Sequence, residues 1–146
     1  MLTAVGLGPG DAELLTLKAV RLLQEADTVF VPGGIAYDLV KPYCENIVTL
    51  DFPMTRDEAE ISRCMEENAE KILPAAKNGS AVFGLIGDPN YYSTFSRLAE
   101  AVRRLDSSVV VETIPGISSI TAVASHAKIP VNGAFLVTDG PAEPTT

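Results

Sequence analysis

Short apolar runs alternate with longer amphipathic segments along most of this 146-residue chain. Glycine and proline punctuate the chain between these segments, and the apolar runs predict strands over residues 2–6, 28–31, 47–50, 80–86, 108–113 and 134–137. The segments between them predict helices, over residues 11–26, 35–43, 56–73, 89–105 and 117–127. Strands that alternate with helices at this spacing form right-handed βαβ units. The pattern therefore predicts an α/β fold with a mainly parallel sheet and flanking helices.

Polar residues mark where several of these helices are expected to begin. Asp11 is placed to cap the first helix, and Thr55 with Glu58 has the spacing of a capping box before the third. Asp88 is placed to cap the fourth, with Pro89 at its first helical position. The apolar stripes expected to be buried are Ile61, Cys64, Met65, Ile72 and Leu73 on the third helix, and Tyr92, Phe95, Leu98, Ala99, Val102 and Leu105 on the fourth.

Composition excludes several classes of protein. With 19 Asp and Glu against 11 Lys and Arg, the net charge of -8 disfavours binding to nucleic acid. No apolar run is long enough to span a membrane, and the N-terminus lacks the pattern of a signal peptide. Cys44 and Cys64 are too few for a disulfide framework and have no cysteine or histidine at metal-ligand spacing. We expect a cytoplasmic protein with free thiols, no metal site and no membrane or nucleic-acid partner.

Three turns that follow predicted strands carry the candidate functional residues. Ligands of parallel α/β folds bind beyond the carboxyl ends of the strands, so these turns are expected to lie together. The first turn, Gly6-Leu7-Gly8-Pro9-Gly10-Asp11, superficially resembles a dinucleotide fingerprint. Its third glycine comes one residue early, and no acidic residue follows the second strand to bind a ribose. A tight strand-to-helix turn with only a structural role is the alternative.

The second and third turns bring more polar side chains than a helix cap requires. The second runs from Gly87 to Thr94 and contains two tyrosines and two hydroxyl residues, which suit a small polar ligand with an aromatic component. The third, Ile114-Pro115-Gly116-Ile117-Ser118-Ser119, again places hydroxyl groups at a helix start. Either turn, taken alone, is also explained as ordinary capping.

Taken in order, the three turns resemble the motifs of the tetrapyrrole methylase family. The first turn together with Glu13-Leu14-Leu15-Thr16-Leu17-Lys18-Ala19 is similar to the opening signature of that family. Gly87-Asp88-Pro89 and the third turn are similar to its second and third blocks, and the resemblance extends from Thr3 to about Val137. Two further segments, 51–55 and 92–95, resemble one branch, the precorrin-2 or cobalt-precorrin-2 C(20)-methyltransferases of cobalamin synthesis.

The resemblance implies a homodimeric enzyme with two α/β domains and a cleft between them. The cleft would hold S-adenosylmethionine, whose product is S-adenosylhomocysteine, beside a tetrapyrrole substrate. Carried over by motif, the donor-binding residues would be Pro9, Gly87, Asp88, Tyr91, Tyr92, Ser93, Thr94, Ser118 and Ser119. Gly8, Gly10 and Asp11 would border the tetrapyrrole. Residues 1–113 would form the first domain, and residues 114–146 only the beginning of the second.

Methyl transfer from a sulfonium to an electron-rich carbon mostly requires alignment of the two reactants. We therefore expect no dedicated nucleophile and a weak base for proton loss, for which Asp11 is the candidate. The carboxylates of a tetrapyrrole would need local cations in so acidic a chain, and Lys41, Arg56 and Arg97 are the candidates.

Other functions remain open from the sequence. The acceptor could be another corrin carbon or uroporphyrinogen, and the substrate could already carry cobalt. A non-catalytic binding or dimerisation module is a different class, in which the short fold persists without turnover. A nucleotide-binding oxidoreductase depends on Gly6-Leu7-Gly8 alone and fails because no acidic residue follows the second strand to bind a ribose.

Overall fold

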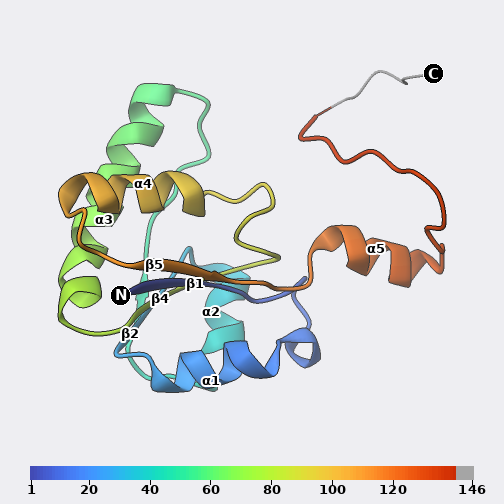
Figure 1. Ribbon diagram of the computed structural model, residues 1–146, viewed down its shortest axis with the longest axis horizontal. Helices are drawn as coiled ribbons and strands as arrows, with labels where there is room; N and C mark the ends of the chain where they lie inside the picture. Colours follow the sequence, from blue (N-terminus) through green and yellow to red (C-terminus); the bar gives the residue numbers. More distant parts are fainter. Residues whose placement is uncertain (141–146) are drawn as a thin grey trace.

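Five parallel strands form the centre of the molecule, as the computed structural model of residues 1–140 shows (Figure 1). The strands are β1 (Leu2–Gly6), β2 (Thr28–Val31), β3 (Ile47–Thr49), β4 (Ala81–Leu85) and β5 (Val111–Ile114). They lie in the order β3-β2-β4-β1-β5, and every pair of neighbours is parallel. The predicted α/β class and parallel sheet are confirmed.

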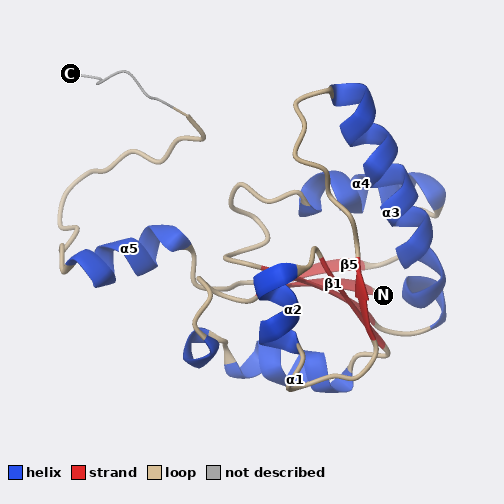
Figure 2. Ribbon diagram, turned by 180° about the vertical axis from the view of Figure 1, so that it is seen from behind, coloured by secondary structure: helices blue, strands red, loops and turns tan. Residues whose placement is uncertain are grey.

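Helices cover both faces of this sheet (Figure 2). The helices are α1 (Leu17–Glu25), α2 (Gly34–Val40), α3 (Glu58–Asn78), α4 (Phe95–Leu105) and α5 (Ser119–Ala127), with a short 3-10 helix at Ala12–Leu14. One hydrophobic core, containing Ala19, Leu23 and Val40, joins α1 and α2 to one face of the sheet. The other, containing Ile72, Phe83 and Leu98, joins α3 and α4 to the opposite face.

The strand order reverses direction where β1 and β4 lie side by side. From β1 the chain passes to β2 and β3 through α1 and α2, on one face. From β4 it crosses β1 to reach β5 through α4, on the other face. The loops that leave β1 and β4 therefore separate to opposite faces and leave a crevice between them, the position at which doubly wound folds bind ligands.

Three helices have other N-terminal caps than the sequence predicts. Asp11 caps the 3-10 helix, whereas α1 begins after Thr16, whose hydroxyl accepts from the Ala19 N–H at 3.0 Å. The predicted capping box at Thr55 is wrong, because Asp57 caps α3 and accepts from the Ala59 N–H at 3.0 Å. Serine, threonine and aspartate all make good caps, so their order along the chain does not select among them.

The fourth helix departs furthest from its predicted start. The prediction that Asp88 caps it and that Pro89 opens it is wrong, since α4 begins at Phe95 after Thr94. Tyr92 and Leu105, predicted to be buried, are 63% and 44% exposed. The six residues from 89 to 94 form a loop instead, and this loop supplies side chains to the crevice.

The remaining differences between the predicted and the observed elements are small, except in the segment 134–137. Helix α3 continues through Pro74 to Asn78 because Ile72 and Ala76 on its inner face are buried. Cys64, Ile61 and Leu73 are partly rather than fully buried. The predicted strand over 134–137 is absent: this segment runs away from the sheet, has no strand edge beside it and leaves Leu136 65% exposed (Figure 1). None of the helices within residues 1–140 combines the length with the apolar composition that a membrane-spanning helix needs.

Candidate functional site

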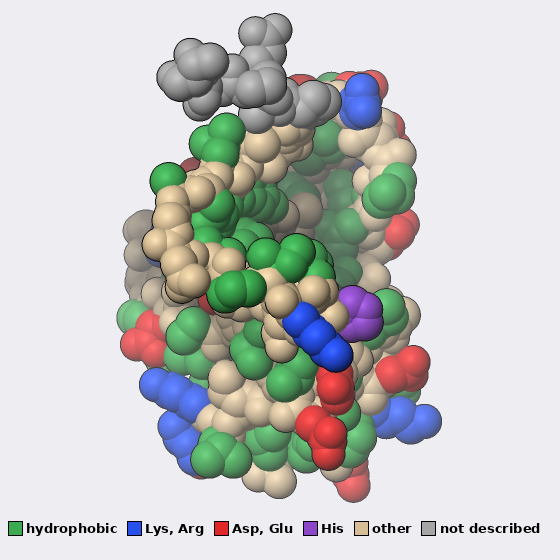
Figure 3. Space-filling model, turned by 90° about the vertical axis from the view of Figure 1, so that its right-hand side faces the viewer, with side chains coloured by type: hydrophobic (Ala, Val, Ile, Leu, Met, Phe, Trp, Pro, Cys, Tyr) green, Lys and Arg blue, Asp and Glu red, His purple; other side chains and the backbone are tan. Residues whose placement is uncertain are grey.

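A cavity of about 250 Å³ lies at the carboxyl ends of β1 and β4. It is lined by Pro9, Ile86, Gly87, Asp88, Tyr91, Tyr92, Ser118, Ser119 and Ile120. Seven of the nine residues predicted to bind the donor are among these. Residues that follow β1, β4 and β5 are therefore brought into one place, although they lie up to 111 positions apart in the sequence. Figure 3 shows hydrophobic side chains gathered in a hollow on this side of the molecule.

Three glycines allow the backbones of these loops to meet. A Cβ atom on Gly6 would lie 2.6 Å from both the Gly116 nitrogen and the Gly87 carbonyl oxygen, and a Cβ on Gly116 would also collide with Gly87. The Gly87 N–H donates to the Gly8 carbonyl at 2.7 Å, which joins the first loop to the second. Any larger side chain at Gly6 or Gly116 would force the loops apart, so the cavity depends on both residues.

Asp88 lines the cavity and connects two of its walls. Its side chain is buried, with 8% exposed. One carboxylate oxygen accepts from the Asn90 N–H at 2.8 Å, and the other accepts from the Gly116 N–H at 3.0 Å. The second of these bonds ties the loop after β4 to the loop after β5.

Two exposed tyrosines form the wall contributed by the loop after β4. Tyr91 is 59% exposed and Tyr92 is 63% exposed. Tyr92 has a φ of +53°, a left-handed conformation that side chains other than glycine, asparagine and aspartate rarely adopt. Residues held in such conformations cluster at ligand sites, where surrounding structure maintains the strain.

The opposite wall is the beginning of α5. Ser118 precedes the helix with extended backbone and makes no capping hydrogen bond through its side chain. The first N–H groups of a helix favour anions and polar acceptors, so Ser118 and Ser119 present both hydroxyl groups and backbone donors to the cavity.

Two predicted donor residues do not reach the cavity. The Ser93 hydroxyl donates to the Pro89 carbonyl and accepts from the Phe95 N–H, so it organises the loop. Thr94 instead lines a second cavity of about 160 Å³, with Phe52, Met65 and Arg97 among its other walls.

The residues predicted to border the substrate lie outside the cavity lining. Gly8 is buried and Gly10 is exposed, and both have positive φ, at +77° and +122°. The Asp11 carboxylate is exposed and accepts from the Glu13 N–H at 2.9 Å as the cap of the 3-10 helix. The loop after β1 nevertheless contributes Pro9 to the lining, so these residues continue the same wall.

The three candidate cations are distributed unevenly around the sheet. Lys41 follows α2 near the amino ends of the strands, away from the cavity. Arg56 lies in the loop after β3 and Arg97 in the first turn of α4, both towards the carboxyl ends. The Arg97 guanidinium is paired with Glu58 at 2.7 Å.

The sequence reasoning did not single out Ile86 and Ile120, although both line the cavity. Ile86 was expected within a strand and Ile120 within a helix. The available signal was the position of Ile86 immediately before Gly87, because a residue at the carboxyl end of a central strand faces the crevice.

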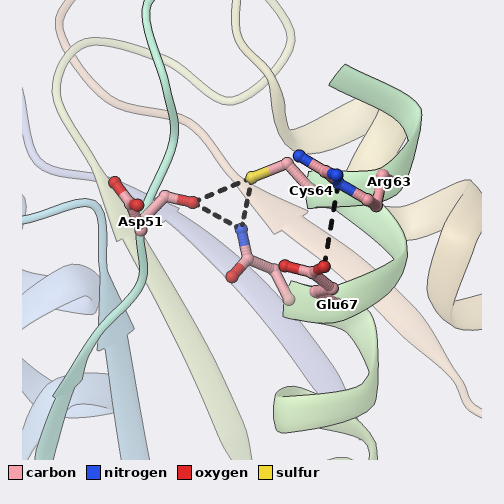
Figure 4. A network of polar contacts seen from close by, with 5 residues as sticks. Asp51, Arg63, Cys64 and Glu67 are labelled. Atoms are coloured by element: carbon pink, nitrogen blue, oxygen red, sulfur yellow. Dashed lines mark hydrogen bonds and ion pairs between the residues drawn. The ribbon is translucent and has the colours of Figure 1, made fainter. Parts of the chain in front are cut away.

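A polar network outside the cavity fixes the loop after β3 to α3 (Figure 4). The Cys64 thiol donates to the Asp51 carbonyl at 3.0 Å, and the Asn68 amide donates to the same oxygen at 2.8 Å. Burial, together with the charges of Asp51 and Glu67, raises the pKa of the Cys64 thiol. Burial also raises the pKa of Cys44. Neither thiol is therefore activated as a nucleophile.

Comparison with known proteins shows the family of the chain. Residues 1–140 match the family of Tetrapyrrole (Corrin/Porphyrin) Methylases. The chain is 40% identical over 135 residues to a probable cobalt-precorrin-2 C(20)-methyltransferase of Methanocaldococcus jannaschii, with 87% of this chain and 57% of that protein covered. It is 37% identical over 129 residues to a uroporphyrinogen-III C-methyltransferase of Cyanidium caldarium, with 87% of this chain and 49% of that protein covered.

A solved structure shows the same fold. The chain superimposes with a TM-score of 0.60 and 29% identity on a uroporphyrin-III C-methyl transferase of Thermus thermophilus complexed with S-adenyl homocysteine, covering 84% of this chain and 47% of that one. The chain thus spans about half the length of the proteins that it matches.

Proposed function

Because this chain belongs to the tetrapyrrole (corrin/porphyrin) methylases, we propose that it binds S-adenosylmethionine and takes part in methyl transfer to carbon 20 of precorrin-2 or its cobalt complex. The observation that carries the proposal is the cavity at the ends of β1 and β4. Seven residues named from the motifs of three separate loops line it together. The choice of carbon 20 rests on the segments 51–55 and 92–95 and on the similarity to the Methanocaldococcus protein.

The lining suits the donor in shape and chemistry. A Cβ on Gly87 would point into open space, so its absence lets a ligand approach the backbone of this loop directly. Ser118, without a capping bond of its own, offers a hydroxyl to a polar group. The tyrosine rings attract a cation through their faces, which suits a sulfonium.

In this proposal the protein contributes alignment rather than covalent chemistry. S-adenosylmethionine supplies an electrophilic methyl group on its sulfonium. The two walls hold the reacting centres in line, which removes roughly 7–11 kcal/mol from the barrier in well-oriented reactions.

Asp11 is proposed as the weak base that accepts a proton from the acceptor carbon. Its carboxylate is exposed and lies on the loop that also supplies Pro9 to the cavity. The substitution Asp11→Asn in the full enzyme is expected to lower turnover without changing donor affinity. An unchanged rate would remove Asp11 from the mechanism.

The second candidate acceptor is uroporphyrinogen, because the Cyanidium protein is almost as similar to this chain as the Methanocaldococcus protein. Methyl-transfer assays with precorrin-2, its cobalt complex and uroporphyrinogen separate the acceptors. We also propose a homodimeric, cytoplasmic protein in which residues 1–113 form the first domain and residues 114–146 begin the second.

Calorimetric titration with S-adenosylhomocysteine tests the donor site. We expect micromolar binding to this chain, weakened about tenfold or more by Tyr91→Ala and unchanged by Tyr37→Ala. Tyr37 is a matched control, since it is also exposed but lies on α2 and outside the cavity lining. Binding of NAD in place of S-adenosylhomocysteine would overturn the proposal and support a nucleotide-binding oxidoreductase.

A further inference from the structure

We propose that Asp88 is a positioning residue, which holds the two walls of the cavity in register through backbone amides instead of contacting the donor. The inference builds on the proposed function of the cavity as the donor site. It differs from the role that the sequence motifs imply, in which Asp88 binds the donor directly.

The hydrogen bonds of Asp88 carry this inference. Both carboxylate oxygens accept from backbone N–H groups, those of Asn90 and Gly116, at 2.8 and 3.0 Å. Bonds from N–H groups to a charged, buried carboxylate are among the stronger hydrogen bonds of proteins. Asn90 belongs to the loop that carries Tyr91 and Tyr92, and Gly116 lies two residues before Ser118. The Asp88 side chain thus connects the loop that carries the two tyrosines to the segment that leads into α5.

The wall at α5 has little else to hold it. None of the side chains of α5 is buried. The hydrogen bonds described for residues 118–129 stay within that segment. The nearest hydrogen bond to the rest of the fold is the one from Gly116 to Asp88, 28 positions away in the sequence. Loss of that bond should therefore release the beginning of α5 more than any other part of the site.

Glycine packing makes the connection sensitive to small displacements. The backbones of three glycines, Gly6, Gly87 and Gly116, lie against one another. A Cβ atom added to Gly6 or Gly116 would collide with the neighbouring backbone. The loops meet correctly only when the Gly116 backbone lies against Gly87, which is the position that the Asp88 carboxylate maintains.

Amide hydrogen exchange measured by NMR tests the connection without any ligand. The substitution Asp88→Asn keeps the size of the side chain but turns one acceptor into a donor that faces a backbone N–H. We expect exchange at Gly116 and in the first turn of α5 to accelerate about tenfold or more, while the β1 and β4 amides stay protected. Unchanged exchange at Gly116 and α5 would overturn the proposal.

Asp106→Asn is the matched control. The Asp106 carboxylate likewise accepts from a backbone N–H, that of Ser108 at 2.9 Å, but it follows α4 at the amino ends of the strands. This variant should leave exchange at Gly116 unchanged. An equal acceleration in both variants would show a general loss of stability and would also overturn the proposal.

Two ligands separate positioning from direct contact. S-adenosylhomocysteine carries an amino-acid group with an ammonium, whereas 5′-methylthioadenosine lacks it. If Asp88 acts by position, Asp88→Asn should weaken both ligands by a similar factor of about ten or more. If it contacts the donor ammonium, only S-adenosylhomocysteine should weaken, and the positioning role is wrong. Failure of the unmodified chain to bind either ligand would contradict the proposed function, while hydrogen exchange would still decide the role of Asp88.

Discussion

At the scale of single residues, the site combines satisfied polar groups with one strained backbone position. Asp88 is buried but fully engaged, and no buried side-chain nitrogen or oxygen among the described residues lacks a partner. Tyr92 is the exception in conformation, with a φ of +53° in the middle of the cavity wall. A fold that retains such a residue gives up stability at the place where a ligand is expected.

Replacing Tyr92 by glycine should therefore stabilise the fold while weakening donor binding. Glycine adopts positive φ without the clash of a Cβ, so Tyr92→Gly is expected to raise the free energy of unfolding by about 0.5–1 kcal/mol. Urea denaturation measures the change as a higher midpoint at constant slope.

Tyr91→Gly is the control for this comparison. Tyr91 lines the same cavity and is similarly exposed, but its φ is not positive. Glycine should lower the stability there. A decrease in both variants would show that Tyr92 is not strained.

Asp106 gives a prediction for pH. Hydrogen bonds from the Ser108 hydroxyl and amide, together with Lys77, lower the pKa of its carboxyl from 3.8 to about 2. Because the pKa is lower in the folded chain, the ionised carboxylate stabilises the fold above about pH 4, and this stabilisation is lost as the pH falls towards 2. Asp106→Asn should therefore lower the melting temperature at pH 7 and make little difference at pH 2. A difference that does not change with pH would contradict this assignment.

At the scale of elements, the helix starts decide which residues are free for the site. Because α4 begins at Phe95 and not at Pro89, Tyr91 and Tyr92 lie in a loop and face the cavity. The same kind of shift at α3 moves its cap from Thr55 to Asp57. In α4 the first helical residue, Phe95, is already buried, whereas α3 makes about two turns before its first buried residue, Met65.

The cap of α3 is open to direct test. Asp57→Ala should lower the free energy of unfolding by about 1 kcal/mol, because the Ala59 N–H loses its acceptor. Thr55→Ala should have a smaller effect, since its hydroxyl accepts only from the Asp57 N–H ahead of the helix. Thermal or urea unfolding of both variants measures the difference. A larger loss for Thr55→Ala would restore the capping box that the sequence predicted.

At the scale of the whole molecule, stability is concentrated in the sheet and its four covering helices. The central strands β1 and β4 each pair on both sides and are buried along their length. Helix α5 and the segment that follows it extend away from this body, with Val123, Phe135 and Leu136 each more than half exposed (Figure 1). The cavity lies between these two parts of the molecule. The wall formed by the loop after β4 is held by the sheet, whereas the wall formed by the beginning of α5 depends on a few local contacts.

Hydrogen exchange across the whole chain should follow this division. Amides of β1 and β4 are expected to open only with global unfolding, and those of α5 to exchange orders of magnitude faster. Binding of S-adenosylhomocysteine should slow exchange in α5 and leave β1 nearly unchanged. Equal protection in α5 and β1 before ligand is added would contradict this picture.

Much of the site could be predicted from the sequence because its motifs follow strands. In a parallel sheet, residues that follow strands meet at one edge, so Pro9, Gly87 and Ser118 could be brought together from their positions alone. Ser93 and Thr94 fail this prediction because their orientation depends on where α4 begins. Ile86 and Ile120 were missed because apolar residues next to a turn do not differ from core residues in the sequence.

The class of fold, the family and the position of the crevice could be predicted from the sequence, because periodicity and loop motifs are local properties of the chain. The helix starts, the absence of a strand at 134–137 and the hydrogen-bond partners of Asp88 could be read only from the packed structure. Each of these depends on a partner far away in the sequence: the sheet beneath α4, a strand edge for 134–137 to join, and the Gly116 amide. A local pattern shows that a residue can cap, pair or be buried, but the packed chain determines which partner is within reach.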